Sequence, residues 1–401
     1  ALSIAIPLRS IGGLLASLRR PLVLALAVGL LAWGAGRYTS TLWYALGRFT
    51  FDSAAGVLRL AGQHVVAERS HFDLGIDDFS VHIAPSCAGY EGIGLILVFL
   101  GAFLWLEHRK LNFPRAVLLL PLGVAAVLVA NILRIAALVA LGRWVSPEMA
   151  EGGFHSKAGW VLYCGIALGI AALARRSGFF LRQAQQPADE TWNPTAAYLG
   201  PLLALLATTL VTGLVVVDFD YLYPLRFLVV AAVIWVYHDV LPPRSYRPSW
   251  EAIALGVVVF ALWMGLESQP DMSRVSAWQA RITAMSPAMR AGWLFFRILG
   301  SVLTVPIAEE LAFRGYLLRR LVAPEFTDVS PRTMTCAALL LSSVAFGALH
   351  QRWIAGTLAG LFYAFAQHRR GQLGDAIVAH AVTNALIAAA VLLLGQTWLW
   401  L

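Results

Sequence analysis

The sequence contains few charged residues. Asp, Glu, Lys and Arg make up 13% of its 401 residues, whereas hydrophobic residues make up 59%. Soluble domains usually carry about 25% charged residues, so the composition excludes an ordinary soluble protein and predicts a multi-pass membrane protein. The formal net charge of +8 does not indicate a nucleic-acid partner, because the arginines gather at the ends of apolar runs, as in the cytoplasmic loops of membrane proteins.

Cysteine is also scarce. Cys87, Cys164 and Cys336 form no CxxC pair, so neither a disulfide framework nor a metal knuckle is expected. Cys164 and Cys336 lie in or beside apolar runs, where cysteine usually packs as a small apolar residue. No cleavable signal peptide is expected either, because Arg37 follows the first apolar run where a small-residue cleavage site would be needed.

The apolar runs predict an all-α fold, a polytopic membrane bundle of about eleven transmembrane helices, each near or slightly below the roughly 20 residues that a bilayer requires. Thr41–Leu60 is less apolar and is expected to lie in the interface or to re-enter the membrane. A polar stretch with two prolines predicts a linker at 183–195 between membrane domains at 1–182 and 196–401. The predicted spans are Pro21–Gly36, Tyr90–Leu106, Ala116–Leu141, Gly159–Ala174, Ala196–Val217, Leu225–Val240, Ala252–Leu266, Trp293–Leu321, Ala337–Leu349, Ile354–Ala366 and Ala376–Leu394.

The basic residues predict the orientation of these spans. Arg9, Arg19 and Arg20 precede the first span, which places the N-terminus in the cytoplasm. The stretches Glu68–His82 and Arg143–Ser156 then fall outside, and Glu267–Arg290 is expected as an amphipathic segment at the outer face. The same count places inside the clusters Arg109/Lys110/Arg115, Arg175/Arg176/Arg182, Arg244/Arg247, Arg319/Arg320 and Arg369/Arg370.

Three ionisable residues converge on the outer face under this topology. Cys87 immediately precedes one span and His155 another, while Arg134 lies 18 residues into a span that starts inside, roughly 27 Å up at 1.5 Å per residue. Histidine can take the proton of a thiol, and arginine can stabilise a developing oxyanion. Each residue alone also has a structural explanation, because a loop cysteine often packs and an arginine near a span end often reaches the headgroups.

The sequence around these residues is Pro85-Ser86-Cys87-Ala88-Gly89, then Asn131-Ile132-Leu133-Arg134, then His155. It resembles the exosortase and archaeosortase family over about Pro21–Arg176. The resemblance implies that Cys87 is a nucleophile assisted by His155 and Arg134. It also implies exported partners that end in a sorting motif, an apolar helix and a basic tail, which is removed and in some cases exchanged for an acceptor that the sequence does not identify.

A second constellation lies near the C-terminus. Glu309 and Glu310 are adjacent carboxylates in an apolar run, where ionisable residues are costly and usually functional. Glu310 and Arg314 are four residues apart and are expected to pair, which leaves Glu309 as a general base for water. Two further pairs at a spacing of four, Phe346/His350 and His380/Asn384, each share a helix face. Structural explanations remain open for each, such as an interfacial His350 or a helix-packing Asn384.

Together these motifs resemble the CAAX-protease and bacteriocin-processing family over about Trp293–Leu394. The resemblance implies that Glu309 and His350 activate water, that His380 and Asn384 stabilise the oxyanion, and that Glu310 and Arg314 support the site. Glutamate and histidine can also ligate zinc, but no HExxH is present and the resemblance favours a site without metal or other cofactor. Nearly the whole chain resembles the exosortase E/protease fusions, whose substrate tails carry a Val-Pro-Glu-Ile-Asp-type motif. Neither set of motifs reaches Ala196–Arg290, where only apolar spans are predicted.

The depth of this second site is less clearly predicted. The topology puts His350 toward the outer end of its span and Glu309 and His380 toward the inner half, whereas the short Ile354–Ala366 span favours a site near mid-membrane. The sequence therefore predicts a membrane protease with two sites, in a bacterial inner membrane with the cysteine site at the periplasmic face. Two alternatives stay open. One is a transporter, although no repeated halves are visible, and the other is a protein that binds sorting tails without cleaving them.

Overall fold

A computed structural model describes residues 43–182, 193–216, 219–238, 248–266 and 271–400, with a few positions between 19 and 38. Contacts divide the chain into two compact units. The first lies within Leu8–Thr191 and includes Gly213–Val217, and the second takes Trp192–Thr212 and Asp218–Leu401. Part of the predicted first span, most of the predicted linker and the cluster Arg244/Arg247 lie outside the described residues. The exact domain boundaries therefore stay a prediction.

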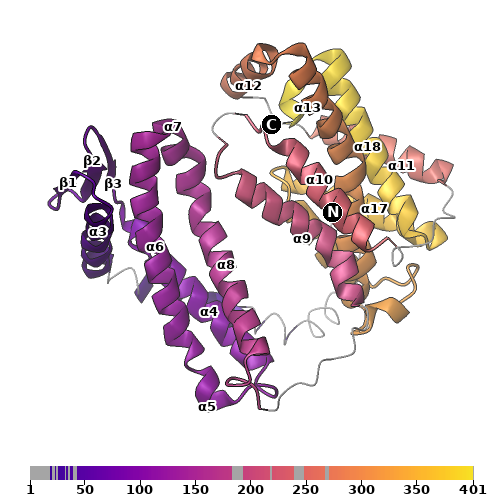
Figure 1. Cartoon of the computed structure of the whole chain (residues 1–401). Helices are drawn as coiled ribbons and strands as arrows, with labels where there is room; N and C mark the ends of the chain where they lie inside the picture. The colour runs from indigo at the N-terminus through magenta and orange to yellow at the C-terminus, as the bar shows by residue number, and fades with distance from the viewer. Residues whose placement is uncertain are drawn as a thin grey trace. The chain divides into compact units, whose positions relative to one another are not determined.

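The first unit is a helical bundle with a small β-sheet at one end (Figure 1). Its long apolar helices α4, α6 and α8 pack on one another through a core of Ile, Leu, Val and Phe side chains. The elements in chain order are α3 (Trp43–Leu60), β1 (Val65–Glu68), β2 (Asp73–Ile76), β3 (Phe79–His82), a 3₁₀ turn (Pro85–Ala88), α4 (Tyr90–Leu106), α5 (Phe113–Ala116), α6 (Leu119–Trp144), α7 (Pro147–Met149), a π-helical turn (Ala150–Phe154) and α8 (His155–Arg176).

The sheet is antiparallel, with strand order β1-β2-β3. Its strands alternate partly buried and exposed residues in β1 and β3, the period of a strand with one face on a core. That face packs on α3 and α6 around Phe51, Leu74 and Ile76. The sequence predicts only that Glu68–His82 lies outside the membrane, because four-residue strands give a weaker periodic signal than the long apolar helices around them.

In the second unit the described residues form helices joined by loops (Figure 1). Its longest continuous helical stretch, Pro287–Arg320, contains π-helical turns at Gly300–Thr304 and Leu311–Leu317. The other helices are α9 (Pro194–Thr212), α10 (Tyr223–Val236), α11 (Trp250–Gly265), α12 (Met272–Ala284), α16 (Cys336–Ala348), α17 (Trp353–Arg370) and α18 (Leu373–Leu394), while α13 (Pro287–Leu299), α14 (Val305–Glu310) and α15 (Leu318–Arg320) are segments of the long stretch.

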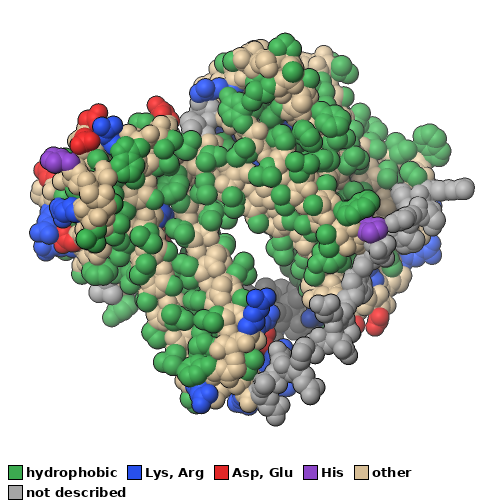
Figure 2. Space-filling view, viewed as in Figure 1, with side chains coloured by type: hydrophobic (Ala, Val, Ile, Leu, Met, Phe, Trp, Pro, Cys, Tyr) green, Lys and Arg blue, Asp and Glu red, His purple; other side chains and the backbone are tan. Residues whose placement is uncertain are grey.

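These helices make the protein a polytopic, all-α membrane bundle, as predicted. Five stretches are long and apolar enough to cross a bilayer, and every predicted span from Tyr90–Leu106 onward coincides with a helix. The visible faces are dominated by hydrophobic side chains, with charged ones mainly toward the ends (Figure 2). Large apolar residues such as Trp105, Leu168 and Leu393 are more than half exposed. Lipid, rather than water, is the solvent that tolerates such a surface.

Contacts at the helix ends agree with the grouping of basic residues. In the first unit, Arg175 at the end of α8 forms an ion pair of 2.6 Å with Glu107, at the end of α4. Arg182 donates to the backbone carbonyl of Leu111. The two basic clusters that were predicted to share one side therefore lie at the same end of this unit.

Candidate active sites

Cys87 lies in the 3₁₀ turn that leads into α4. Gly89 ends this turn with a left-handed φ of 93°, a conformation that glycine adopts without strain. The side chain of Asn131, from α6, donates a hydrogen bond of 2.8 Å to the carbonyl of Cys87, and Thr50 from α3 donates to the next carbonyl, that of Ala88. Two neighbouring helices thus fix the backbone that carries the thiol.

The structure brings the three predicted residues of this site together. Cys87, Arg134 and His155 line a cavity of about 270 Å³ toward α4 and α8, and the same three line a second cavity of about 290 Å³ toward β3. Arg134 contacts the backbone carbonyl of His155 through Nη1 at 3.5 Å. Its Nε is buried and has no hydrogen-bond partner among the described residues.

Cys87 is 6% exposed and lies three residues before Tyr90, the first residue of α4. The free N–H groups at a helix N-terminus favour negative charge nearby. A thiol, an imidazole and a guanidinium around one cavity, next to such a helix end, form an arrangement suited to nucleophilic attack on a carbonyl carbon.

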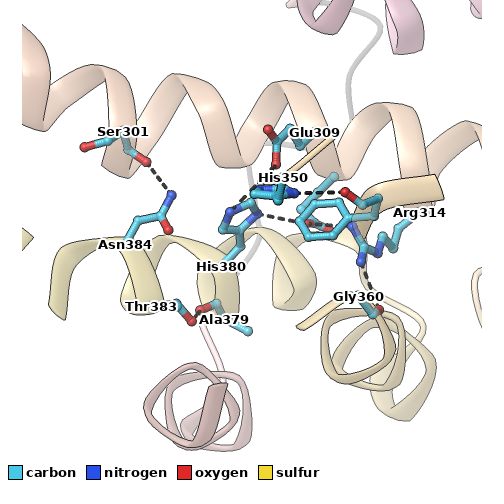
Figure 3. A network of polar contacts seen from close by, with 11 residues as sticks. Ser301, Glu309, Arg314, His350, Gly360, Ala379, His380, Thr383 and Asn384 are labelled. Atoms are coloured by element: carbon cyan, nitrogen blue, oxygen red, sulfur yellow. Dashed lines mark hydrogen bonds and ion pairs between the residues drawn. The ribbon is translucent and has the colours of Figure 1, made fainter. Parts of the chain in front are cut away.

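The second constellation is also assembled, around the middle of the helical stretch Pro287–Arg320 (Figure 3). Glu310 and Arg314 are fully buried and form the ion pair that their spacing predicted, at 3.0 Å. Arg314 also donates to the carbonyl of Gly360 at 2.9 Å. A buried charge that is paired and hydrogen-bonded in this way holds a fixed position, so Glu310 and Arg314 form a rigid support.

Two histidines face Glu309 from other helices. His380 Nε2 and His350 Nε2 each lie 3.9 Å from Glu309 Oε2, and among the described residues this carboxylate oxygen has no hydrogen-bond partner. His380 donates from Nδ1 to Glu310 at 2.9 Å, and His350 donates from Nδ1 to the carbonyl of Phe346 at 2.9 Å. Because each Nδ1 carries the proton, each neutral imidazole presents an unprotonated Nε2 to Glu309. Three proton acceptors therefore converge on one point.

Asn384 lies one turn along α18 from His380. It donates from Nδ2 to the carbonyl of Ser301 at 2.8 Å, which leaves the second amide hydrogen free for another acceptor. His350, His380 and Asn384 line a cavity of about 230 Å³ together with Ser301 and Trp400. The cavity gives a peptide bond room beside the two histidines, whereas Glu309 does not line it.

His350, Glu309 and His380 lie together, with both histidine Nε2 atoms 3.9 Å from Glu309 Oε2, so the three share one place rather than opposite halves of the bundle. The depth of that place in the membrane stays a prediction. Among the described residues, no cluster of three His, Cys, Asp or Glu side chains has the arrangement of a metal site. The metal-free mechanism stays a prediction.

Several residues that position this site belong to none of the sequence motifs. Tyr363 stacks on the His380 ring with centroids 4.7 Å apart. Gly360 lets α17 approach closely, since a Cβ there would lie 3.0 Å from Ser343 Cα and 3.1 Å from Arg314 Nη2. The sequence does contain a signal for such an approach, the small residues at helical spacing Gly356, Ala359 and Gly360. Nothing local distinguishes Tyr363 from other aromatic residues.

Two family models match the chain. Residues 4–172 match the model described as transmembrane exosortase (EpsH), and residues 291–386 match the one described as type II CAAX prenyl endopeptidase Rce1-like. The chain joins an exosortase-type region to a CAAX-protease-type region. The first region contains Cys87, Arg134 and His155, and the second contains all six predicted residues from Glu309 to Asn384.

No curated protein and no solved structure matches the chain. The predicted fusion of the two families is confirmed by the two regions. Both families are membrane proteases, which supports proteolytic processing in the membrane as the role of the protein. Proteolysis is thereby favoured over the transporter alternative.

Proposed function

We propose that the exosortase-type unit is a cysteine protease or transpeptidase that removes C-terminal sorting tails from exported proteins. It acts at the periplasmic face of the inner membrane. The single observation that supports this most is the pair of cavities around Cys87, Arg134 and His155, residues from three different helical elements. The proposed substrate tail consists of a short motif, an apolar helix and a basic cluster.

In the proposed reaction His155 takes the proton of the Cys87 thiol, and the thiolate sulfur attacks the carbonyl carbon of the scissile peptide bond. The guanidinium of Arg134, which lines both cavities, stabilises the oxyanion. The C–N bond breaks, the leaving amine takes the proton from His155, and a thioester remains on Cys87. Water or an acceptor amine then attacks the thioester carbonyl and restores the thiol.

For the second unit we propose an intramembrane protease that depends on Glu309. A water molecule within reach of Glu309, His350 and His380 gives up a proton to this group of acceptors as its oxygen attacks the peptide carbonyl. The remaining amide hydrogen of Asn384 and protonated His380 stabilise the oxyanion, and the proton passes to the leaving amine. Arg314 and Glu310 hold His380 in the required tautomer.

The first site is tested with an exported reporter that ends in a Val-Pro-Glu-Ile-Asp motif, an apolar helix and an arginine cluster. Wild type, Cys87→Ala and Cys164→Ala are each co-expressed with the reporter, and mass spectrometry reads its C-terminus. We expect trimming by wild type and Cys164→Ala and none by Cys87→Ala. Cys164 is an appropriate control because it is an exposed cysteine on α8 that lines neither cavity.

A transferred acceptor appears in the same spectra as added mass on the trimmed reporter. Trimming that persists in Cys87→Ala contradicts the cysteine mechanism and moves the activity to Glu309. A protein that binds sorting tails without cleaving them gives an untrimmed reporter that co-purifies with wild type and with Cys87→Ala alike.

A further inference from the structure

Strand β3 is the edge of the sheet on the side of the first site. The sheet order is β1-β2-β3, and β3 pairs only with β2 among the described strands. An edge strand presents a row of backbone N–H and C=O groups to whatever lies beside it. Proteins commonly use such an edge to bind an extended peptide as an additional strand.

The register shows which residues of β3 point outward. Ile83 N donates to Phe72 O at 2.9 Å, and the paired residues continue as Asp73 with His82 and Gly75 with Ser80. In an antiparallel pair, hydrogen-bonded and non-hydrogen-bonded positions alternate. The backbone N–H groups of Ser80 and His82 therefore point away from β2, toward the open edge.

The open edge of β3 and Cys87 line the same cavity. The cavity of about 290 Å³ is lined by Ser80 to Ile83 on one side and by Cys87, Arg134 and His155 on the other. The Ser80 and His82 side chains are exposed. The turn from β3 to Cys87 is held by hydrogen bonds from Ala84 N to His82 O and from Cys87 N to Ala84 O, which fixes the strand relative to the thiol.

We propose that β3 binds the sorting tail by β-augmentation: the extended backbone of the tail, next to the bond that Cys87 attacks, pairs with the outward-facing N–H groups of Ser80 and His82. This inference rests on the proposed function of the first site and assigns the sheet as its substrate-binding element. Backbone pairing positions a peptide regardless of its side chains, and the cavity beside Arg134 then selects the residue at the cleavage point.

The test removes one outward N–H without disturbing the ladder between β2 and β3. Ser80→Pro eliminates this donor at a position where an edge strand tolerates proline, and Ser80→Ala is the matched control because it keeps the N–H. With the same reporter, we expect Ser80→Pro to trim at least tenfold more slowly than Ser80→Ala. Equal rates for the two variants overturn the inference.

A second measurement does not depend on how Ser80→Pro folds. Synthetic tail peptides carrying a single backbone N-methyl group, moved residue by residue along the segment around the cleaved bond, are incubated with the detergent-solubilised wild-type protein. Because alternate residues of a bound strand face β3, we expect cleavage to fall at every second position. If methylation lowers cleavage equally at every position, or at no position, β-augmentation is overturned. Cleavage of the peptide in that case still supports the proposed first site. Failure of wild type to cleave the unmethylated peptide and the reporter refutes the proposed function, and the inference with it.

Discussion

Glu309 Oε2 is the point on which the second site depends, since two histidine Nε2 atoms lie 3.9 Å from it. Glu309→Gln keeps the size of the side chain and removes the base. General base catalysis contributes about 10²–10⁴-fold, so we expect a loss of this order in the intramembrane protease activity, measured as cleavage of a membrane-embedded reporter peptide. Glu325→Gln, at an exposed carboxylate outside the site, is expected to leave this activity unchanged. Equal activity of Glu309→Gln and wild type contradicts the assignment.

The element that carries Cys87 depends on the conformation of Gly89. Gly89→Ala places a side chain on a left-handed residue and brings its Cβ within 2.9 Å of Asn131 Nδ2, which holds the Cys87 carbonyl. Gly62→Ala is matched in φ, at 76°, but its Cβ meets nothing within 4 Å. We expect each variant to lose about 1–2 kcal/mol of stability from the left-handed backbone, and only Gly89→Ala to lose tail trimming as well.

Thermal unfolding in detergent measures the loss of stability that the left-handed backbone causes in both variants, and the reporter assay measures trimming. If Gly62→Ala also stops trimming, backbone strain alone explains the effect, and the contact between Gly89 and Asn131 is not what positions the thiol.

Helix α17 approaches Arg314 closely at Gly360. Gly360→Ala puts a methyl group 3.1 Å from Arg314 Nη2 and 3.0 Å from Ser343 Cα, so α17 has to shift. Overpacking of this kind costs about 1–3 kcal/mol and displaces the support of Glu310 and His380. We expect lower stability and a marked loss of intramembrane cleavage. Gly292→Ala, which meets nothing within 4 Å, is expected to be neutral in both measurements.

Three π-helical turns lie beside the candidate residues. Ala150–Phe154 ends next to His155, while Gly300–Thr304 and Leu311–Leu317 lie on either side of Glu309 and Glu310. Such turns rotate the residues that follow relative to a regular helix, and they are frequent at functional sites. They were not visible in the spacing of the motifs, because a sequence with helical periodicity does not reveal where one residue is inserted in a turn.

At the scale of the whole molecule, each unit contains a complete set of candidate residues and its own cavity. We therefore expect the two activities to be separable. Cys87→Ala should abolish tail trimming and leave cleavage of the membrane-embedded reporter intact, while Glu309→Gln should have the opposite effect. Both reporters are measured with both variants. Loss of both activities in either single variant would show that one site acts on the product of the other or depends on it for folding.

The sequence by itself determined the class of the protein and the identity of the candidate residues. Apolar runs with basic ends predict a helical membrane bundle because a lipid environment leaves the backbone few other structures. Rare ionisable residues in those runs stand out for the same reason, so Cys87, Arg134 and Glu309 could be found without coordinates. Their convergence on one face in the first site also followed from counting spans.

Only the tertiary structure decided how these residues meet. The short α16 brings His350 to Glu309, the stacking of Tyr363 and the hydrogen bond to Glu310 orient His380, and the packing of the small sheet on α3 and α6 puts an open strand edge beside Cys87. These contacts join residues that are far apart in the chain, and periodicity reports only which face a residue occupies on its own element. The local pattern therefore specified the groups, and packing between elements specified the distances on which their chemistry depends.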